Sequence, residues 1–177
     1  MSIYQKLSKI APNYVSKHKL FKWGFNISPM YRMSTARITT VSDDLKLVRI
    51  KLPINYKNRN YAGSIFGGSL FASVDPIPMV QLLYILDNQY IVWDKSAEIF
   101  FKIPARENLY AEFTYTDEEV ESIKHQVHEH GEFEFVKTNH LTNKTGDRIF
   151  CVVKKKIYIA TKEHFKKKSQ LRKRVSV

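Results

Sequence analysis

The chain has 177 residues, 44% of them hydrophobic and 13% aromatic, which is enough to bury a core and excludes a disordered chain. Its one cysteine, Cys151, excludes a disulfide scaffold and a cysteine-based zinc finger. The net charge of +12 belongs to the ends: residues 1–42 hold seven Lys/Arg and no acid, residues 162–177 hold seven and one, and the stretch between has a net charge of −1. A basic core that binds nucleic acid is therefore excluded.

The first part of the chain predicts short helices followed by a β-hairpin. The expected elements are a helix through Ile3, Leu7, Ile10 and Ala11, a helix over Pro12–Phe21, a loop over Gly24–Pro29, and strands over Thr35–Ser42 and Leu45–Leu52 joined at Asp43-Asp44. No stretch approaches the roughly 20 apolar residues that a membrane span needs, and the N-terminus lacks the apolar run and cleavage site of a signal peptide. We expect a cytoplasmic protein.

The segment Gly67–Leu86 is unlike the rest of the chain, because it is almost entirely apolar and Asp75 is its only charged residue. A helix that is apolar on nearly all sides is a buried helix. Pro76 and Pro78 predict a kink or a restart in its middle.

Strand-like runs make up most of the remaining chain. They cover Tyr90–Ile103, Leu109–Thr116, Glu132–Thr142 and Arg148–Thr161, and a helical or loop excursion over Asp117–His130, closed by Gly131, interrupts them. Most connections are too short for parallel crossovers, so we expect an antiparallel sheet. An antiparallel sheet of about six strands wrapped around one buried apolar helix is an α+β layout, and a second subunit is the simplest cover for the far side of the helix.

The run Asn60-Tyr-Ala-Gly63-Ser-Ile-Phe66-Gly67-Gly68, followed by Asp75, resembles the signature of hotdog-fold acyl-CoA thioesterases of the phenylacetyl-CoA thioesterase type. That signature reads Asn-x-x-Gly-x-x-His-Gly-Gly, with an Asp seven residues after the second Gly. Every spacing matches, and only the His differs, being Phe66. The Asp-Pro pair and the N-terminal helices are similar to a thioesterase-like branch of the superfamily. The resemblance implies a hotdog domain.

The resemblance also implies roles for these residues. Backbone N–H groups of Gly67 and Gly68 at a helix N-terminus would stabilise the negative oxygen that develops when water attacks a thioester. Asp75 would be the general base or nucleophile, and an apolar setting would favour its neutral form. Asn60, Gly63 and Phe66 would lie at the substrate. The family's pocket lies between subunits, so the resemblance implies a homodimer, or a tetramer, that acts on acyl-CoA or a similar thioester.

Each of these roles has a structural alternative. Asp75 before Pro76 is also a common helix start, with Asp as N-cap. Gly67 and Gly68 also suit close packing of a helix on a sheet, and Asn60 suits an ordinary turn. Phe66 contributes only an apolar wall where the family has a His. The rival to an acyl-CoA hydrolase is therefore a non-catalytic protein that binds acyl chains or acyl-CoA.

Other candidate sites are weaker. His125, His128 and His130, with Glu121 and Glu129, lie in a highly charged segment typical of a solvated face, so we expect no metal site. Cys151 fits a buried apolar strand position, and no Gly-x-Ser-x-Gly elbow or nucleotide-binding loop is present. No cofactor is expected.

The sequence thus predicts an N-terminal helical extension over 1–33, a hotdog domain over 34–161 and a basic C-terminal tail over 162–177. For Lys166–Val177 a solvated, partly disordered tail is favoured. The basic ends have two further interpretations: contact with anionic lipid, helped by Ile3, Leu7, Phe21 and Trp23, or attraction to the phosphates of coenzyme A. Nucleic acid is not expected as a partner.

Overall fold

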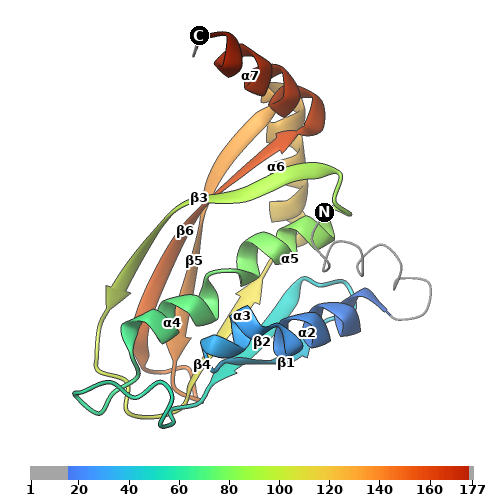
Figure 1. Cartoon of the computed structure of the whole chain (residues 1–177). Coiled ribbons are helices and arrows are strands. Elements are labelled where there is room, and N and C mark those ends of the chain that lie inside the picture. Colours follow the sequence, from blue (N-terminus) through green and yellow to red (C-terminus); the bar gives the residue numbers. More distant parts are fainter. Residues whose placement is uncertain (1–15, 176–177) are drawn as a thin grey trace.

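A computed structural model of the protein describes residues 16–175. Its N-terminal part is helical: α2 spans Lys17–Ile27 and α3 spans Pro29–Met33 (Figure 1). The loop predicted over Gly24–Pro29 is wrong, because α2 continues past Gly24 and only Ser28 separates it from α3. Proline suits the first turn of a new helix, so Pro29 restarts the helix there. The helix predicted around Ile3–Ala11 lies outside the described residues.

Six strands form one antiparallel sheet, as the sequence predicts. They are β1 (Arg37–Val41), β2 (Leu47–Leu52), β3 (Tyr90–Phe101), β4 (Leu109–Thr114), β5 (Glu132–Thr142) and β6 (Ile149–Thr161). Their order is β1-β2-β4-β5-β6-β3, and every neighbouring pair is antiparallel. The 12-residue β3 therefore forms one edge of the sheet and β1 the other.

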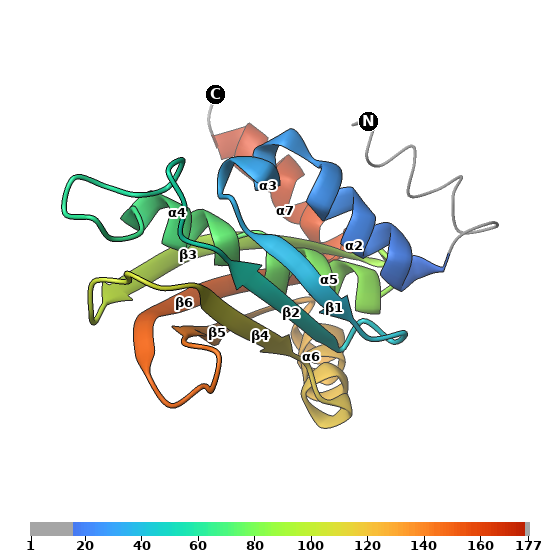
Figure 2. The same ribbon diagram turned by 90° about the horizontal axis from the view of Figure 1, so that it is seen from below.

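The apolar segment forms two helices that follow one another along the sheet (Figures 1 and 2). The first, α4, spans Gly67–Val74, and the second, α5, spans Ile77–Ile85. The predicted restart at the prolines is confirmed. Two buried tyrosines hold the helices near the break: the Tyr31 hydroxyl donates to the Ser73 carbonyl and the Tyr115 hydroxyl donates to the Pro78 carbonyl, both at 3.0 Å. Burial raises the pKa of both phenols, so they remain donors.

The two helices join the hydrophobic core. One core cluster joins Leu70, Val74 and Ile77 to β1, β2 and β4. A second cluster joins Leu82 and Leu86 to Ile157 and Ile159, near the end of β6. The stretch Gly67–Ile85 has the length and composition of a membrane span, but in this fold it is the core helix pair, and 44% of its most apolar window is buried. A single chain therefore covers only part of the segment.

The excursion between β4 and β5 is a helix, α6, over Asp117–His130. The Thr116 side chain accepts a hydrogen bond from the Glu119 amide at its start, and three acids occupy the first turn, where the helix dipole favours them. Gly131 ends the helix in the left-handed conformation, with φ 75°. The buried side chains of α6 cover the second core cluster.

The C-terminal tail is a helix, α7, over Lys162–Val175. The prediction of a solvated, partly disordered tail is wrong for its first turns, because Phe165 packs edge-on against Trp93 at 5.2 Å between ring centroids. Lys168 also binds Glu132 of β5 at 2.6 Å. The Lys/Arg composition concealed this packing, since the aromatic and acidic partners come from strands far away in the sequence.

Gly131 provides a test of this end of the fold. A Cβ there would overlap the ring of His164 on α7, in addition to the backbone strain of a positive φ. Gly146 has φ 82° but open space around it. We expect Gly146→Ala to lower the free energy of unfolding by about 1 kcal/mol and Gly131→Ala by about 2 kcal/mol, measured by urea denaturation. Equal losses would mean that α7 does not pack on this turn.

Candidate functional site

The start of α4 has backbone donors without acceptors. Phe66 is the N-cap residue, and its side chain caps no amide. Its carbonyl accepts from Ser69 and Leu70, whereas the amides of Gly67 and Gly68 have no acceptor among residues 16–175. Two adjacent free amides at the positive end of a helix are suited to bind an anionic or developing negative oxygen.

Close packing requires both glycines as well. A Cβ on Gly67 would lie 2.9 Å from the Phe101 ring of β3, and a Cβ on Gly68 would overlap the ring of Phe66. Packing of the helix on the sheet is therefore shown for Gly67, whereas Gly68 faces only the exposed ring of Phe66. The absence of side chains leaves both amides accessible. Phe66 itself is 58% exposed, and its ring offers no polar atom to orient a thioester.

The residues before α4 form a tight loop. The Asn60 side chain accepts hydrogen bonds from the Ser64 amide and hydroxyl at 3.0 and 3.2 Å, and Gly63 supplies the positive φ of 72° that the turn requires. Asn60 thus has the geometry of an ordinary turn residue. Asn58, which the sequence did not single out, is buried and bonds Thr35 at 2.7 Å. Its carbonyl accepts from the Phe66 amide, so Asn58 positions the start of α4.

Asp75 does not cap the second helix. It is the C-cap residue of α4, and the N-cap of α5 is Pro76, with no side-chain cap bond. The Asp75 carboxylate instead forms an ion pair with Lys155 of β6 through its Oδ1 atom. The side chain is 40% exposed, and the Oδ2 atom has no partner in the described part of the chain. One oxygen is therefore anchored and the other is available to water or a ligand.

Lys155 is the residue that sequence analysis missed. Its side chain is only 2% exposed, and its Nζ lies between Asp75 and Asp94, 3.0 Å from the Oδ2 of Asp94. The Phe71 ring lies 5.5 Å from the same ammonium group. An apolar setting for Asp75 is therefore wrong, because an ammonium ion faces it. A single lysine in an alternating strand gave no signal in the sequence. The pairing of β6 with β3 brings Asp94 to it, and the packing of the α4–α5 joint on the sheet brings Asp75.

Asp94 reaches Lys155 through an irregularity in β3. The register of β3 on β6 shifts between Asp94 and Ser96, which leaves Lys95 as an extra residue. The pKa of Asp94 is raised by burial, and Lys155 opposes that shift. The Oδ1 of Asp94 is buried without a hydrogen-bond partner among the described residues. The cluster thus holds one buried cation between two carboxyl groups.

The structure does not bring the predicted catalytic groups together within one chain. Asp75 follows Gly68 by seven residues, which is about 10 Å along a helix axis. Seven residues are almost two turns, so both lie on the same side of the helix. A single thioester carbonyl cannot touch the Gly68 amide and the Asp75 carboxylate of the same chain.

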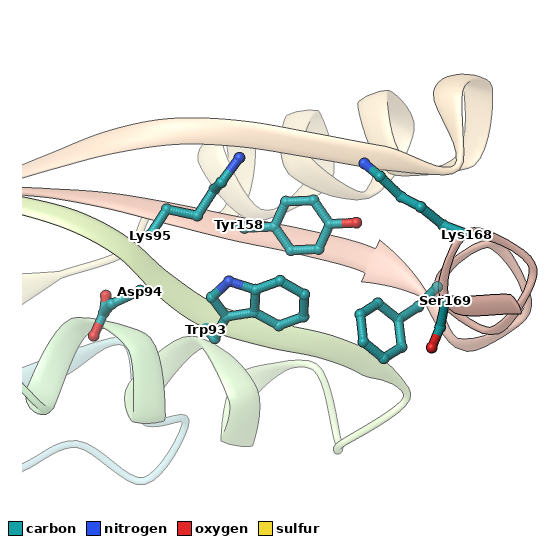
Figure 3. A pocket seen from close by; sticks show the side chains of 7 residues that line it. Trp93, Asp94, Lys95, Tyr158, Lys168 and Ser169 are labelled. Carbon is teal, nitrogen blue, oxygen red and sulfur yellow. The ribbon is translucent and has the colours of Figure 1, made fainter. Parts of the chain in front are cut away.

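A surface hollow of about 340 Å³ lies elsewhere, between β3, β6 and α7 (Figure 3). Trp93 and Tyr158 stack along its wall with ring centroids 4.4 Å apart. Its two lysines are already paired, Lys95 with Glu134 and Lys168 with Glu132. The pKa of Glu132 is lowered by Lys168 and the Tyr158 hydroxyl. Paired lysines attract a phosphate weakly, so this hollow gives no support to coenzyme A phosphates bound by the basic C-terminus.

The structure also locates the two weaker candidates, the histidines for a metal site and Cys151 for a nucleophile. His125 and His128 lie on α6 beside a second hollow of about 550 Å³, and within residues 16–175 no group of three or more His, Cys, Asp or Glu side chains is arranged to hold a metal. Cys151 is buried as predicted, and burial raises the pKa of its thiol to about 11. At neutral pH it is a thiol rather than a nucleophilic thiolate.

Solved structures share this architecture. A Pseudomonas aeruginosa protein of unknown function, described as a probable thioesterase, is 18% identical and covers 81% of this chain and 95% of its own, with a TM-score of 0.71. A Haemophilus influenzae thioesterase (11% identical, 83% and 92% covered, TM-score 0.61) and zebrafish thioesterase superfamily member 2 (14%, 80% and 96%, 0.58) are similar as well. The fold is therefore the hotdog fold of the thioesterase superfamily, as the sequence motif implies.

Residues 17–156 match the family described as a domain of unknown function, DUF4442, and the chain belongs to that thioesterase-like family. A search of curated proteins finds no match.

The Lys155 cluster predicts a pH-dependent loss of stability. Lys155→Met leaves two carboxyl groups together without their cation, so we expect the free energy of unfolding at neutral pH to fall by about 3 kcal/mol. Without Lys155 the pKa of Asp94 rises further. The folded state then binds a proton more tightly than the unfolded state, and stability is lost as pH rises through the folded pKa.

The deficit relative to wild type should accordingly be smaller at about pH 4 than at about pH 8 in urea denaturation. The matched control is Lys156→Met, the next residue of the strand, which is exposed and has no ion pair among the described residues. It should cost less than about 0.5 kcal/mol at either pH. A pH-independent deficit for Lys155→Met would mean that lost packing dominates.

Proposed function

We propose that the protein hydrolyses an acyl-CoA or a related thioester. The observation that carries the proposal is the uncapped start of α4, where the amides of Gly67 and Gly68 have no acceptor among the described residues. In a thioesterase-superfamily fold these amides are placed to stabilise the oxyanion of the tetrahedral intermediate. Asp75 activates or positions the attacking water through its free oxygen, and Asn60, Gly63 and Phe66 shape the loop beside the acyl group.

Lys155 is a positioning residue in this scheme. It fixes one oxygen of Asp75 and leaves the other for water.

Hydrolysis by these groups requires a homodimer, because Asp75 and the glycine amides of one chain are too far apart to share a carbonyl. Two further features support a second chain. The 12-residue edge strand β3 has a free side, and Phe66 and Phe101, beside the glycines, are 58% and 57% exposed. A long exposed strand edge is a template for pairing with another copy. A cytoplasmic enzyme remains our expectation.

The rival function is binding of acyl-CoA without hydrolysis. Phe66 favours it, because a phenyl ring cannot take the orienting role of a histidine. The ion pair with Lys155 favours it too, because Lys155 already occupies one of the two carboxylate oxygens of Asp75. The two functions differ in whether Asp75 acts on a bound thioester.

Asp75→Asn separates hydrolase from binder. We expect the wild type to release free thiol from some acyl-CoA among short, long and aromatic ones, and Asp75→Asn to lower kcat at least about 100-fold, because an amide cannot accept the proton. Asparagine can still accept the hydrogen bond from Lys155, so the thermal transition should change little. Asp87→Asn, which alters an exposed carboxylate paired with Lys17, should keep the wild-type rate. Binding of acyl-CoA without any turnover by the wild type would favour the binder.

A mixed dimer tests whether the site forms between chains. Gly68→Val blocks the amides, Asp75→Asn removes the base, and each variant alone should be inactive. Co-expressed with two different affinity tags and purified as the mixed dimer, they leave one intact site of two, so we expect about half the wild-type rate per dimer.

A mixed dimer as inactive as its parents would mean that Gly68 and Asp75 do not meet across an interface. A monomer in sedimentation at micromolar concentration would contradict the dimer itself.

A further inference from the structure

Helices α2 and α3 present large apolar side chains to the outside. We call Trp23, Ile27, Met30 and Met33 the α2–α3 stripe; their exposed fractions are 56%, 68%, 68% and 81%. Trp23 and Ile27 are four residues apart and lie on one side of α2. Figures 1 and 2 both place the two helices on the outside of the molecule, beside β1. Contiguous exposed apolar side chains on a folded domain mark an interaction surface.

The opposite side of these helices is anchored to the domain. Phe21 and Tyr31 are buried in the core, so the lipid contact predicted for Phe21 is wrong. The Asn26 side chain binds both the amide and the carbonyl of Ile38 in β1, each at 2.9 Å. The stripe is therefore held in place by a folded element, and its exposure is a property of the fold.

The surroundings of the stripe are cationic. Lys19 lies one turn before Trp23 on the same side of α2, and Arg32 lies between the two methionines of α3. Neither has an acidic partner among the described residues, and residues 1–42 contain no acid. Two nearby acids, Asp43 and Asp87, are already paired with His18 and Lys17. Lys19 and Arg32 are thus unpaired cations beside the stripe.

We propose that the α2–α3 stripe docks the protein on an anionic lipid surface. Exposed apolar side chains with a flanking tryptophan and unpaired cations are the composition of a helix that lies in the headgroup region. A second copy fits less well, because a two-fold interface over the stripe would place Lys19 and Arg32 against a surface equally rich in cations. The free edge of β3 also offers a second copy a different place to pair. Docking here is independent of the proposed hydrolysis.

Trp23 serves as the reporter. The chain has two tryptophans, and Trp93→Phe leaves Trp23 alone while keeping an aromatic ring against Tyr158. With vesicles of phosphatidylcholine containing phosphatidylserine, we expect a blue shift of the Trp23 emission and quenching by brominated acyl chains. Vesicles of phosphatidylcholine alone should produce neither at physiological salt, since charge and apolar contact are both needed for stable docking.

Variants locate the binding surface. In co-sedimentation with the same vesicles, Lys19→Gln with Arg32→Gln should weaken partitioning by about 25-fold, since each cation near an anionic surface contributes about fivefold. Ile27→Ser with Met30→Ser should weaken it at least about tenfold. The matched control is Val136→Ser, which changes an equally exposed side chain on β5, 54% accessible, and should bind like wild type.

Three results would overturn the proposal. A blue shift that grows with protein concentration in the absence of lipid would assign the stripe to a second copy. Vesicle binding that the α2–α3 variants leave intact would assign it to another basic element, such as α7. Failure of the protein to co-sediment with anionic vesicles would exclude lipid as the occupant.

Discussion

Burial of the apolar segment Gly67–Leu86 is the constraint on which the other elements depend. Its first half packs with α2, α3 and the hairpin of β1 and β2. Its second half packs with α6, with the first residues of β3 and β5, and with the last part of β6. The segment therefore belongs to both core clusters, as does the long strand β6. A single chain still leaves part of the segment uncovered, since 44% of its most apolar window is buried.

Charged side chains gather at the break between the two helices of that segment. Pro76 and Pro78 prevent one continuous helix, and Asp75 occupies the joint between the two pieces. Lys155 is the buried charge here, and it reaches Asp75 from β6 while also binding Asp94 of β3. The charged cluster thus ties the joint to two strands.

The two ends of α4 carry different chemical groups. One end offers backbone donors for a negative oxygen, and the other offers a carboxylate with one free oxygen. About 10 Å of helix keeps the two apart within a chain. The proposed site between two chains is the arrangement in which both groups would act on one thioester.

Sequence alone determined the secondary structure in the middle of the chain and the fold class. Six strands and the proline restart follow from local patterns, and the motif over Asn60–Gly68 with Asp75 predicts the hotdog fold. Local patterns failed where the decisive partner is distant in sequence. They did not predict that α7 packs on the sheet through Phe165 and Trp93, or that α2 continues past Gly24. The N-cap interpretation of Asp75 was equally consistent with the sequence. The structure excludes it, because Pro76 is the N-cap of α5 and the Asp75 carboxylate binds Lys155.

The sequence therefore predicted which residues form the candidate site, but not how they are arranged. A motif names Gly67, Gly68 and Asp75, but residue types carry no information on how far apart they lie or what faces them. Lys155 reaches Asp75 across 80 positions of chain, and Asp94 reaches Lys155 through an extra residue in β3. Such contacts depend on strand register, which is set by the packing of the whole sheet. The sequence determined which chemical groups are present, and the tertiary structure decided which of them meet.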